Sequence, residues 1–413
     1  MIALMSAYAK LKNGGSLGKE DILDLKRGDI KSFQWSSLAV QLALKDQNRW
    51  ERELLISIIK DLPELECYIH TLKESTCSTP TPNVKPEYLY ILNNTAKNKV
   101  IGQDHIKYLI TNFVGEEISL NFMAVWLMTV CYRGLSQDDL HCLTNEMIQS
   151  GDVIDYRNQE ELKNKKIVRR YPTGALSEKV ALILPALISS VRNEFPVISP
   201  FLVAKSLGFT GGTWDKLKAI PGFTFPDPGP EAIKALKQCG IAMSVTKENL
   251  CPADRKMYQF RSMTGTIESP ELIIASIASK QLALPADHLL MDVRYGEGAF
   301  IPTYKEAKEL AISLSNFINE GGVPCSYHLT NSSEPNGMAI GNAYEVLEAI
   351  AVMNREFEST WDLRAIKEQK ELVITFFEIL MSNAFPEENI DWKRLANKQF
   401  DEGRVFQSFL NIL

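Results

Sequence analysis

The chain has 413 residues, of which 45% are hydrophobic and 23% charged, and its formal net charge is −6. These values are typical of a soluble globular protein with more than one domain; they exclude a mainly disordered chain, and the acidic balance argues against a nucleic-acid-binding surface. The apolar run Val180–Ile188 is too short for a membrane span, and the N-terminus lacks the charged region of a secretory signal. Seven cysteines without a CxxC pair and five histidines, none four residues from another, predict reduced cytoplasmic thiols and no metal site.

Helices are predicted throughout the first part of the sequence. Residues 1–62 place apolar side chains at helical spacing, as in Lys19–Leu25 and Leu38–Leu44. The segment Cys77–Pro86 contains three prolines, which favour extended backbone, and we interpret it as a linker. The helical pattern then returns, and we expect helices at Tyr88–Asn94, Gly102–Phe113, Leu120–Cys131 and Gln137–Ser150.

The two helical stretches look alike. The residues from Gly28 (GDIKSFQWSSLAVQLALKDQNRWERELLISIIKD) parallel those from Glu116 (EEISLNFMAVWLMTVCYRGLSQDDLHCLTNEMIQ) in the spacing of helices, turn and apolar face. Any two amphipathic helix pairs share some of these features. We favour the interpretation that a small helical unit has been duplicated.

From about residue 152 short strand candidates alternate with helices, which favours an α/β sheet. The predicted strands are Val153–Asp155, Lys166–Val168, Pro196–Ser199, Gly222–Phe225, Ile241–Val245, Leu289–Arg294 and Ser326–Leu329. The predicted helices are Glu178–Val191, Pro230–Gln238, Tyr304–Glu320, Ala343–Met353, Lys367–Met381 and Gly403–Leu413, and one further helix, Pro270–Leu284, interrupts the alternation.

Two glycine-containing turns precede predicted helices, at Arg169–Lys179 and at Gly208–Lys216. Free N–H groups at such a turn suit an anion, although the turns are also routine strand-to-helix connections. The basic run Lys163–Arg170 is either a charged strand edge or a surface that steers an anionic substrate. We favour the first role for its lysines and the second for Arg169 and Arg170.

Five segments together resemble the pyrimidine nucleoside phosphorylase family, which includes thymidine phosphorylase. The signature is LGFTGGTWDKLKAIPGF from Leu207, and the same pattern continues in TGALSEKVALIL, CPADRKMYQFRSMTGTIESPELIIASIASKQLA, MDVRYGEGAF and MAIGNAYEVLEAI. Their order and spacing also match, so that the resemblance covers roughly Pro86 to the C-terminus. With Phe406–Leu413 as the last residues, we expect the family's C-terminal domain to be missing.

The resemblance implies an α/β domain and a separate helical domain, an architecture shared by class II nucleoside phosphorylases and anthranilate phosphoribosyltransferase, with the active site in the cleft between the domains. We expect an extra N-terminal helical unit at 1–75, a linker at 76–86, a helical domain formed by 87–151 and about 252–284, and an α/β domain formed by 152–251 and about 285–413. Family members are usually homodimers joined through their helical domains. The N-terminal unit is therefore expected to pack on the second helical unit and to imitate or modify that contact.

The base-binding groups of the family have counterparts here. The resemblance implies that Arg261, Ser276 and Lys280 hold a pyrimidine, with Tyr258 one turn before the arginine. Fixed cationic donors at the carbonyl oxygens of the base would stabilise the negative charge that develops as the base departs. Serine and lysine four residues apart on a helix share one face. From the second loop, Leu207 and Phe209 are also expected beside the substrate, and Phe209 stands where the family has histidine.

The phosphate-binding groups of the family are largely replaced. Arg170 stands for a lysine, Tyr171 for a histidine proposed to protonate the leaving base, and Pro172 for a phosphate-binding serine. Two further serines correspond to Ala181 and Val203, whereas the threonine is kept as Thr213. Hydrogen bonds to a charged group contribute roughly 1.5–3 kcal/mol each, so that three losses remove roughly 4–9 kcal/mol of phosphate binding. We expect Arg170, Thr173, Lys179 and Thr213 to face the phosphate or another acceptor.

The sequence therefore predicts a pentosyltransferase or N-glycosidase that cleaves the glycosidic bond of a pyrimidine nucleoside or nucleotide, with Arg170, Tyr171, Arg261 and Lys280 as catalytic residues. Open alternatives are a nucleoside hydrolase, sugar transfer to a non-phosphate acceptor, and a non-catalytic nucleoside-binding homologue. Asp215, Glu178 or Glu297 could orient a water molecule, although each is also a helix-start or loop carboxylate. We expect a cytoplasmic homodimer with no cofactor, metal, nucleic acid or membrane partner.

Overall fold

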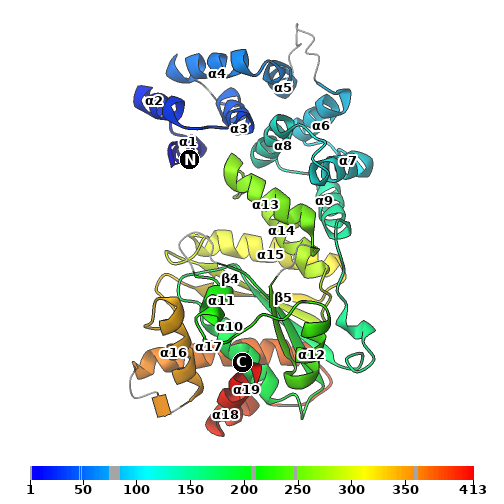
Figure 1. Cartoon of the computed structure of the whole chain (residues 1–413), viewed down its shortest axis with the longest axis vertical. Helices are drawn as coiled ribbons and strands as arrows, with labels where there is room; N and C mark the ends of the chain where they lie inside the picture. The colour runs from blue at the N-terminus through cyan, green and yellow to red at the C-terminus, as the bar shows by residue number, and fades with distance from the viewer. Residues whose placement is uncertain are drawn as a thin grey trace. The chain divides into compact units, whose positions relative to one another are not determined.

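The computed structural model describes residues 2–45, 47, 49–73, 84–205, 211–245, 249–354, 356–357 and 361–413 (Figure 1). The chain divides into two compact units. Unit 1 comprises Met1–Asp152 and Glu248–Lys280, and unit 2 comprises Val153–Lys247 and Gln281–Leu413. Most of the predicted linker at 76–86 lies outside the described residues.

Unit 1 is entirely helical in its described part. Its helices are α1 (Ile2–Lys12), α2 (Lys19–Arg27), α3 (Ser32–Ala43), α4 (Arg49–Asp61), α5 (Glu64–Leu72), α6 (Pro86–Ala96), α7 (Gln103–Val114), α8 (Leu120–Arg133), α9 (Gln137–Gln149), α13 (Pro252–Thr264) and α14 (Pro270–Leu282). The first five helices and the later ones form one compact unit because α3 packs on α8 and α5 packs on α6. The N-terminal helices therefore contact the second helical set.

The helices of unit 1 repeat in order. Helices α1 and α6 both have 11 residues, and α4 and α9 both have 13. Helix α1 packs on α3 as α6 packs on α8, and α2 packs on α4 as α7 packs on α9. Equivalent helices, α3 and α8, then pack on each other. This correspondence supports an internal duplication, with α1–α4 as the N-terminal copy and α6–α9 as the second copy.

One polar contact recurs in both copies. Glu51, the third residue of α4, accepts a hydrogen bond from the N–H of Leu17 at 2.9 Å. Asp139, the third residue of α9, accepts from the N–H of Ile101 at 2.8 Å. Leu17 and Ile101 each directly precede the N-cap glycine of the second helix of their copy. Each carboxylate thus ties the start of its helix to the loop before that second helix.

Unit 2 is built on a five-stranded parallel sheet with the order β3-β2-β1-β4-β5. Its strands are β1 (Lys166–Pro172), β2 (Val197–Val203), β3 (Ile241–Val245), β4 (His288–Tyr295) and β5 (Cys325–Asn331). Its helices are α10 (Val180–Ser190), α11 (Thr213–Lys218), α12 (Pro230–Cys239), α15 (Tyr304–Glu320), α16 (Asn342–Met353), α17 (Leu363–Ala384), α18 (Trp392–Asp401) and α19 (Arg404–Ile412). Figure 1 shows α15 and α17 on opposite sides of the sheet.

The main core of unit 2 lies between the sheet and α10. This helix is buried along nearly its whole length and packs against α16, α17 and α19. Val168 of β1 and Leu290 of β4 contribute to the same cluster from the sheet. Strands buried on both faces are read as continuous apolar runs, which is why β2, β3 and β4 were visible in the sequence.

Two predicted strands are wrong. Residues 153–155 and 222–225 form no strand. Phe223 is buried in the core of unit 2, and the ring of Phe225 stacks on Trp214 with 5.7 Å between centroids. The apolar residues of 222–225 are thus explained by side-chain packing, without backbone pairing to a neighbouring strand.

Candidate functional site

The order of the strands marks the place where a ligand is expected. From β1 the chain adds β2 and β3 on one side of the sheet and then returns to add β4 and β5 on the other. In open parallel sheets, ligands bind outside the carboxyl ends of the strands at such a reversal. In unit 2 this position is the end of β1 and β4, where Pro172 pairs with Asp292.

A cluster of four buried charged side chains lies beside this position, and we call Arg170, Glu178, Asp292 and Arg294 the charge cluster. Arg170 Nη2 donates to Glu178 Oε1 at 3.1 Å and also pairs with Asp292. Arg294 Nε donates to Asp292 Oδ2 at 2.8 Å, and its Nη2 lies 3.6 Å from Glu178 Oε1. No side chain of the cluster is more than 6% exposed. Its two positive and two negative charges cancel.

The pKa values of the two carboxylates show that the neighbouring positive charges outweigh the effect of burial. Burial alone would raise the pKa of Asp292, but the guanidinium groups of Arg294 and Arg170 lower it to about 2. The pKa of Glu178 is also lowered, because the same two arginines and Lys216 outweigh the effect of burial. Both carboxylates are therefore ionised at neutral pH and neutralise the arginines.

A hydroxyl and an imidazole extend the cluster across β5. Thr330 Oγ1 donates to Asp292 Oδ1 at 2.5 Å and lies 3.1 Å from His328 Nδ1. Because the proton of the hydroxyl points to Asp292, Oγ1 accepts the hydrogen bond from Nδ1–H. Burial lowers the pKa of His328, so its imidazole is neutral at pH 7. This chain of groups fixes the orientation of Asp292.

Two further buried ion pairs hold the turn that follows β1. Lys179 Nζ lies 2.9 Å from Glu348 Oε2, and Lys216 Nζ lies 3.0 Å from Glu345 Oε2. Lys216 also donates to the carbonyl oxygen of Glu178 at 2.6 Å. These two lysines are matched by two carboxylates, so the pairs add no net charge to the charge cluster.

The groups expected to face a phosphate are mostly engaged inside unit 2. Arg170 belongs to the charge cluster, and Lys179 is paired with Glu348. The hydroxyl of Thr173 accepts a hydrogen bond from the N–H of Arg294 at 2.9 Å. Thr213 begins the six-residue helix α11 and is half-buried. Tyr171 alternates with Arg170 along β1, so it faces the other side of the sheet.

Arg169, expected to steer an anion, is buried and holds a backbone turn instead. Its Nη1 donates to the carbonyl oxygen of Gln281 at 3.2 Å, and its Nη2 donates to the side-chain oxygen of Gln281 at 2.5 Å. It also donates to the carbonyl oxygen of Leu284. Burial lowers the pKa of Arg169 to about 9.

The residues expected to bind the base lie in unit 1. Lys280 Nζ donates to Ser276 Oγ at 3.1 Å, so these two side chains share one face of α14, and the lysine also pairs with Asp254 at the start of α13. Tyr258 is half-buried on α13, one turn before Arg261. Leu207 and Phe209 lie outside the described residues.

Arg261 uses three of its donors within unit 1. Its Nε donates to Thr266 O at 3.1 Å, its Nη1 to Leu272 O at 2.9 Å and its Nη2 to Ile267 O at 2.5 Å. Burial lowers the pKa of its guanidinium. The side chain therefore joins the end of α13 to the start of α14, and two of the five N–H groups of a guanidinium remain.

Sequence reasoning missed several members of these clusters. Asp292, Arg294 and Thr330 were not singled out, although Asp292 and Arg294 lie in the segment MDVRYGEGAF. A charged residue inside an otherwise apolar strand is the signal that could have identified them, since burying a charge requires a partner. Asp254 gave no such signal, because an acidic residue in the first turn of a helix is common.

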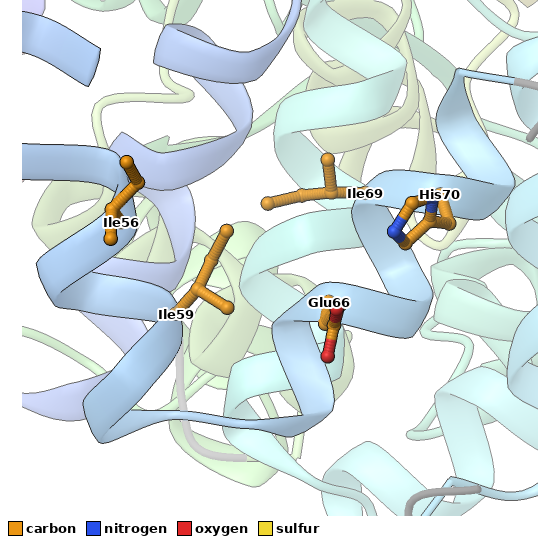
Figure 2. Close-up of a pocket in the computed structure, with 5 residues that line it drawn as sticks. All are labelled: Ile56, Ile59, Glu66, Ile69 and His70. Carbon is orange, nitrogen blue, oxygen red and sulfur yellow. The ribbon is translucent and has the colours of Figure 1, made fainter. Parts of the chain in front are cut away.

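A hollow in unit 1 lies apart from all of these residues. It has a volume of about 260 Å³ and is lined by Ile56, Ile59, Glu66, Ile69 and His70 (Figure 2). These side chains come from α4 and α5, and none of them is a predicted site residue. Within the described ranges, no group of three or more histidine, cysteine or acidic side chains is placed to hold a metal ion, and no helix is long and apolar enough to span a membrane.

Known proteins share parts of this sequence and this architecture. Residues 201–383 match the model of a glycosyl transferase family, a/b domain. The chain is also similar in structure to anthranilate phosphoribosyltransferase (TrpD) from Thermus thermophilus, with a TM-score of 0.54 and 11% sequence identity over 78% of this chain and 97% of that chain. At that identity the likeness establishes the fold, which is a helical domain with a parallel-sheet α/β domain. The chain thus combines this fold with a segment that matches a glycosyl transferase a/b domain.

Proposed function

We propose that the protein cleaves the N-glycosidic bond of a pyrimidine nucleoside or nucleotide and transfers the sugar to an acceptor other than inorganic phosphate. The observation that carries the second part is the charge balance around Arg170. The family match over residues 201–383 supports glycosyl transfer as the reaction class. The counterparts of the base-binding residues support the substrate class.

The charge cluster disfavours a phosphate dianion. Arg170 is the counterpart of a phosphate-binding lysine, but Glu178 and Asp292 already neutralise it. Because the two arginines are already matched by two carboxylates, the cluster offers a phosphate dianion no net attraction to offset the loss of its hydration. A neutral acceptor such as water or an alcohol does not need such an attraction. Arg294 is fully buried and its Nη2 lies 3.6 Å from Glu178 Oε1, so its charge also belongs to this balance and is not available to bind a phosphate.

The base-binding half of the proposal relies on Lys280 and Ser276. Their contact at 3.1 Å places an ammonium and a hydroxyl next to each other on α14. An ammonium at a carbonyl oxygen of the pyrimidine would stabilise the anionic leaving group as the glycosidic bond breaks. The side chain of Lys280 is 20% exposed, and its ammonium contacts Asp254, the carbonyl oxygen of Ser276 and the hydroxyl of Ser276, so a bound base would take the place of one of these contacts.

A second candidate function is nucleoside binding without cleavage. It is favoured by the burial of Arg261, which is 2% exposed and holds three carbonyl oxygens of its own unit. If Arg261 has only this structural role, Lys280 and Ser276 would bind the base without a further cation to stabilise its departure.

The test is base release by the full chain from thymidine, uridine, cytidine and their monophosphates, with and without phosphate. We expect release that does not depend on phosphate and that falls about 10²–10³-fold in Lys280→Met, the usual effect of removing one charge-stabilising donor. Lys256→Met is the matched control, because Lys256 also lies on a helix of unit 1 and pairs with a carboxylate, Glu116, at 3.0 Å.

Three other outcomes are informative. Release that strictly requires phosphate would refute the proposed acceptor. Saturable nucleoside binding by calorimetry without base release would exclude water and phosphate as acceptors and leave either another acceptor or the second candidate function. A chain that neither binds nor cleaves any of these nucleosides would refute both.

A further inference from the structure

The N-terminal copy contacts the turn between α13 and α14. Two polar side chains of α3 reach this turn: Gln34 Nε2 donates to the carbonyl oxygen of Met263 at 3.1 Å, and Ser37 Oγ donates to that of Thr264 at 2.6 Å. Both side chains are buried, with at most 3% of their surface exposed. We call residues 263–267 the base turn, because it connects the two helices that carry the expected base-binding residues.

These two bonds meet a need of the base turn. The last carbonyl oxygens of a helix have no N–H partner within the helix. Helix α13 ends at Thr264, and Gly265 follows in the left-handed conformation with φ +70°. The side chains of α3 thus supply donors to carbonyl oxygens near the end of α13.

A tyrosine of the N-terminal copy covers the same turn. A Cβ atom at Gly265 would lie 2.4 Å from Tyr8 Cδ2, so the ring is in close contact with the glycine. The hydroxyl of Tyr8 donates to the carbonyl oxygen of Gln34 at 2.9 Å. Helices α1 and α3 therefore contact the base turn together.

Arg261 binds the same turn through its own donors. It donates to the carbonyl oxygens of Thr266 and Ile267 in the turn and of Leu272 in α14. The base turn is therefore held by the N-terminal copy through residues 263–265 and by Arg261 through residues 266 and 267.

The duplication shows that the polar side chains of α3 are not required by the helical copy itself. When Ser32, the first residue of α3, is aligned with Leu120, the first residue of α8, Gln34 corresponds to Phe122 and Ser37 to Val125. Both residues of α8 are buried and apolar. Burying a polar group is unfavourable unless it is hydrogen-bonded, so the polar pair in α3 is explained by its bonds to the base turn.

We propose that the N-terminal copy positions the base-binding helices, with Gln34 and Ser37 as positioning residues that act through the base turn. This inference rests on the proposed function, since Tyr258 and Arg261 precede the turn on α13 and Ser276 and Lys280 follow it on α14. By fixing the turn, α3 fixes the geometry of these two helices and the Lys280–Asp254 pair that joins them.

The test compares two neighbouring serines of α3 in the full chain. Both are fully buried, but Ser36 Oγ donates to Ser32 O of its own helix at 3.0 Å, whereas Ser37 Oγ reaches the base turn. We expect Ser37→Ala to accelerate amide hydrogen exchange in residues 263–267 and to weaken nucleoside binding, each about tenfold, which corresponds to about 1.4 kcal/mol. Ser36→Ala is expected to change neither. Ser37→Thr, which keeps the hydroxyl, should restore both.

Gln34→Met provides a second variant in case Ser37→Ala fails to fold. Unchanged exchange in the base turn in both variants would overturn the inference. Faster exchange with unchanged nucleoside affinity would also overturn it, because the contact would then be structural only. A wild-type chain that binds no nucleoside would refute the proposed function, and the exchange measurement would still decide whether α3 holds the turn.

Discussion

Asp292 is the residue through which the charge balance of unit 2 can be tested most directly. It contacts Arg170, Arg294 and Thr330 and is fully buried. Asp292→Asn keeps the shape of the side chain but removes one negative charge, so the charge cluster would carry a buried excess of one positive charge. Removing one partner of a buried ion pair typically costs about 3–5 kcal/mol of the free energy of unfolding.

The pKa of Asp292 gives an independent figure. A pKa lowered from 3.8 to about 2 means that the ionised side chain contributes about 2–3 kcal/mol more than the protonated one. Because the folded-state pKa is the lower one, this contribution is complete above pH 4 and is lost as the pH falls through about 2. The variant lacks it at every pH. The difference in stability between wild type and variant should therefore be largest at neutral pH and should narrow below pH 4.

Urea unfolding, followed by circular dichroism and tryptophan fluorescence, measures this difference. Thr330→Val is the control, because it removes the hydroxyl that donates to Asp292 at 2.5 Å and leaves every charge in place. We expect it to cost about 1–3 kcal/mol. If Asp292→Asn costs no more than Thr330→Val at pH 7, the carboxylate does not neutralise the arginines, and the argument against a phosphate acceptor fails with it.

Three further predictions concern other parts of the chain. Burial lowers the pKa of His288 to about 4, so on acidification the unfolded chain takes up this proton first, and the free energy of unfolding should fall by about 3 kcal/mol between pH 6.5 and 4. Urea unfolding at several pH values in this range should show that the free energy of unfolding depends less on pH in His288→Gln. An equal pH dependence in both proteins would contradict the lowered pKa. Gly265→Ala adds a clash with Tyr8 to a left-handed backbone and should lower the free energy of unfolding by about 1–3 kcal/mol more than Gly14→Ala, where φ is +76° but nothing lies within 4 Å. Equal losses would show that the base turn can move away from Tyr8. Glu51→Gln and Asp139→Asn should each cost about 1.5–3 kcal/mol in urea unfolding; a large loss in only one of them would argue against equivalent roles in the two copies.

Periodicity was sufficient for most of the fold. The long helices of unit 1 have a clear helical spacing of apolar residues, and β2, β3 and β4 were found as apolar runs, although β2 was predicted only to Ser199 and two similar runs formed no strand. Strand β1 was predicted too short, ending at Val168, because Arg169 and Arg170 look like surface residues. Both are buried. Glu178 is near Arg170 in the sequence, but Gln281, which holds Arg169, and Asp292, which pairs with Arg170, lie more than a hundred positions away, where no local pattern can reveal them.

In the candidate site, too, local features could be predicted from the sequence, whereas features that depend on distant residues could not. The sequence predicted that Ser276 and Lys280 share one face of a helix, and the contact between them is consistent with that geometry. The roles assigned to Arg170 and Lys179 came from alignment with family motifs, which compares residues one at a time. Whether a cation is free to bind an anion depends on carboxylates elsewhere in the chain, here Glu178, Asp292 and Glu348, and that information exists only in three dimensions.

The position of β4 in the sheet has a consequence for folding kinetics. Val168 of β1 pairs with His288 of β4, and the intervening chain includes α13 and α14 of the other unit. Closing a loop of that length costs on the order of 4 kcal/mol in chain entropy before the strand pairing repays it. Until β4 pairs with β1, β1 is the edge strand of a sheet whose other strands, β2 and β3, are almost wholly apolar. The unpaired edge of β1 can then pair with strands of other chains. We therefore expect refolding to be slow and its yield to fall with rising protein concentration.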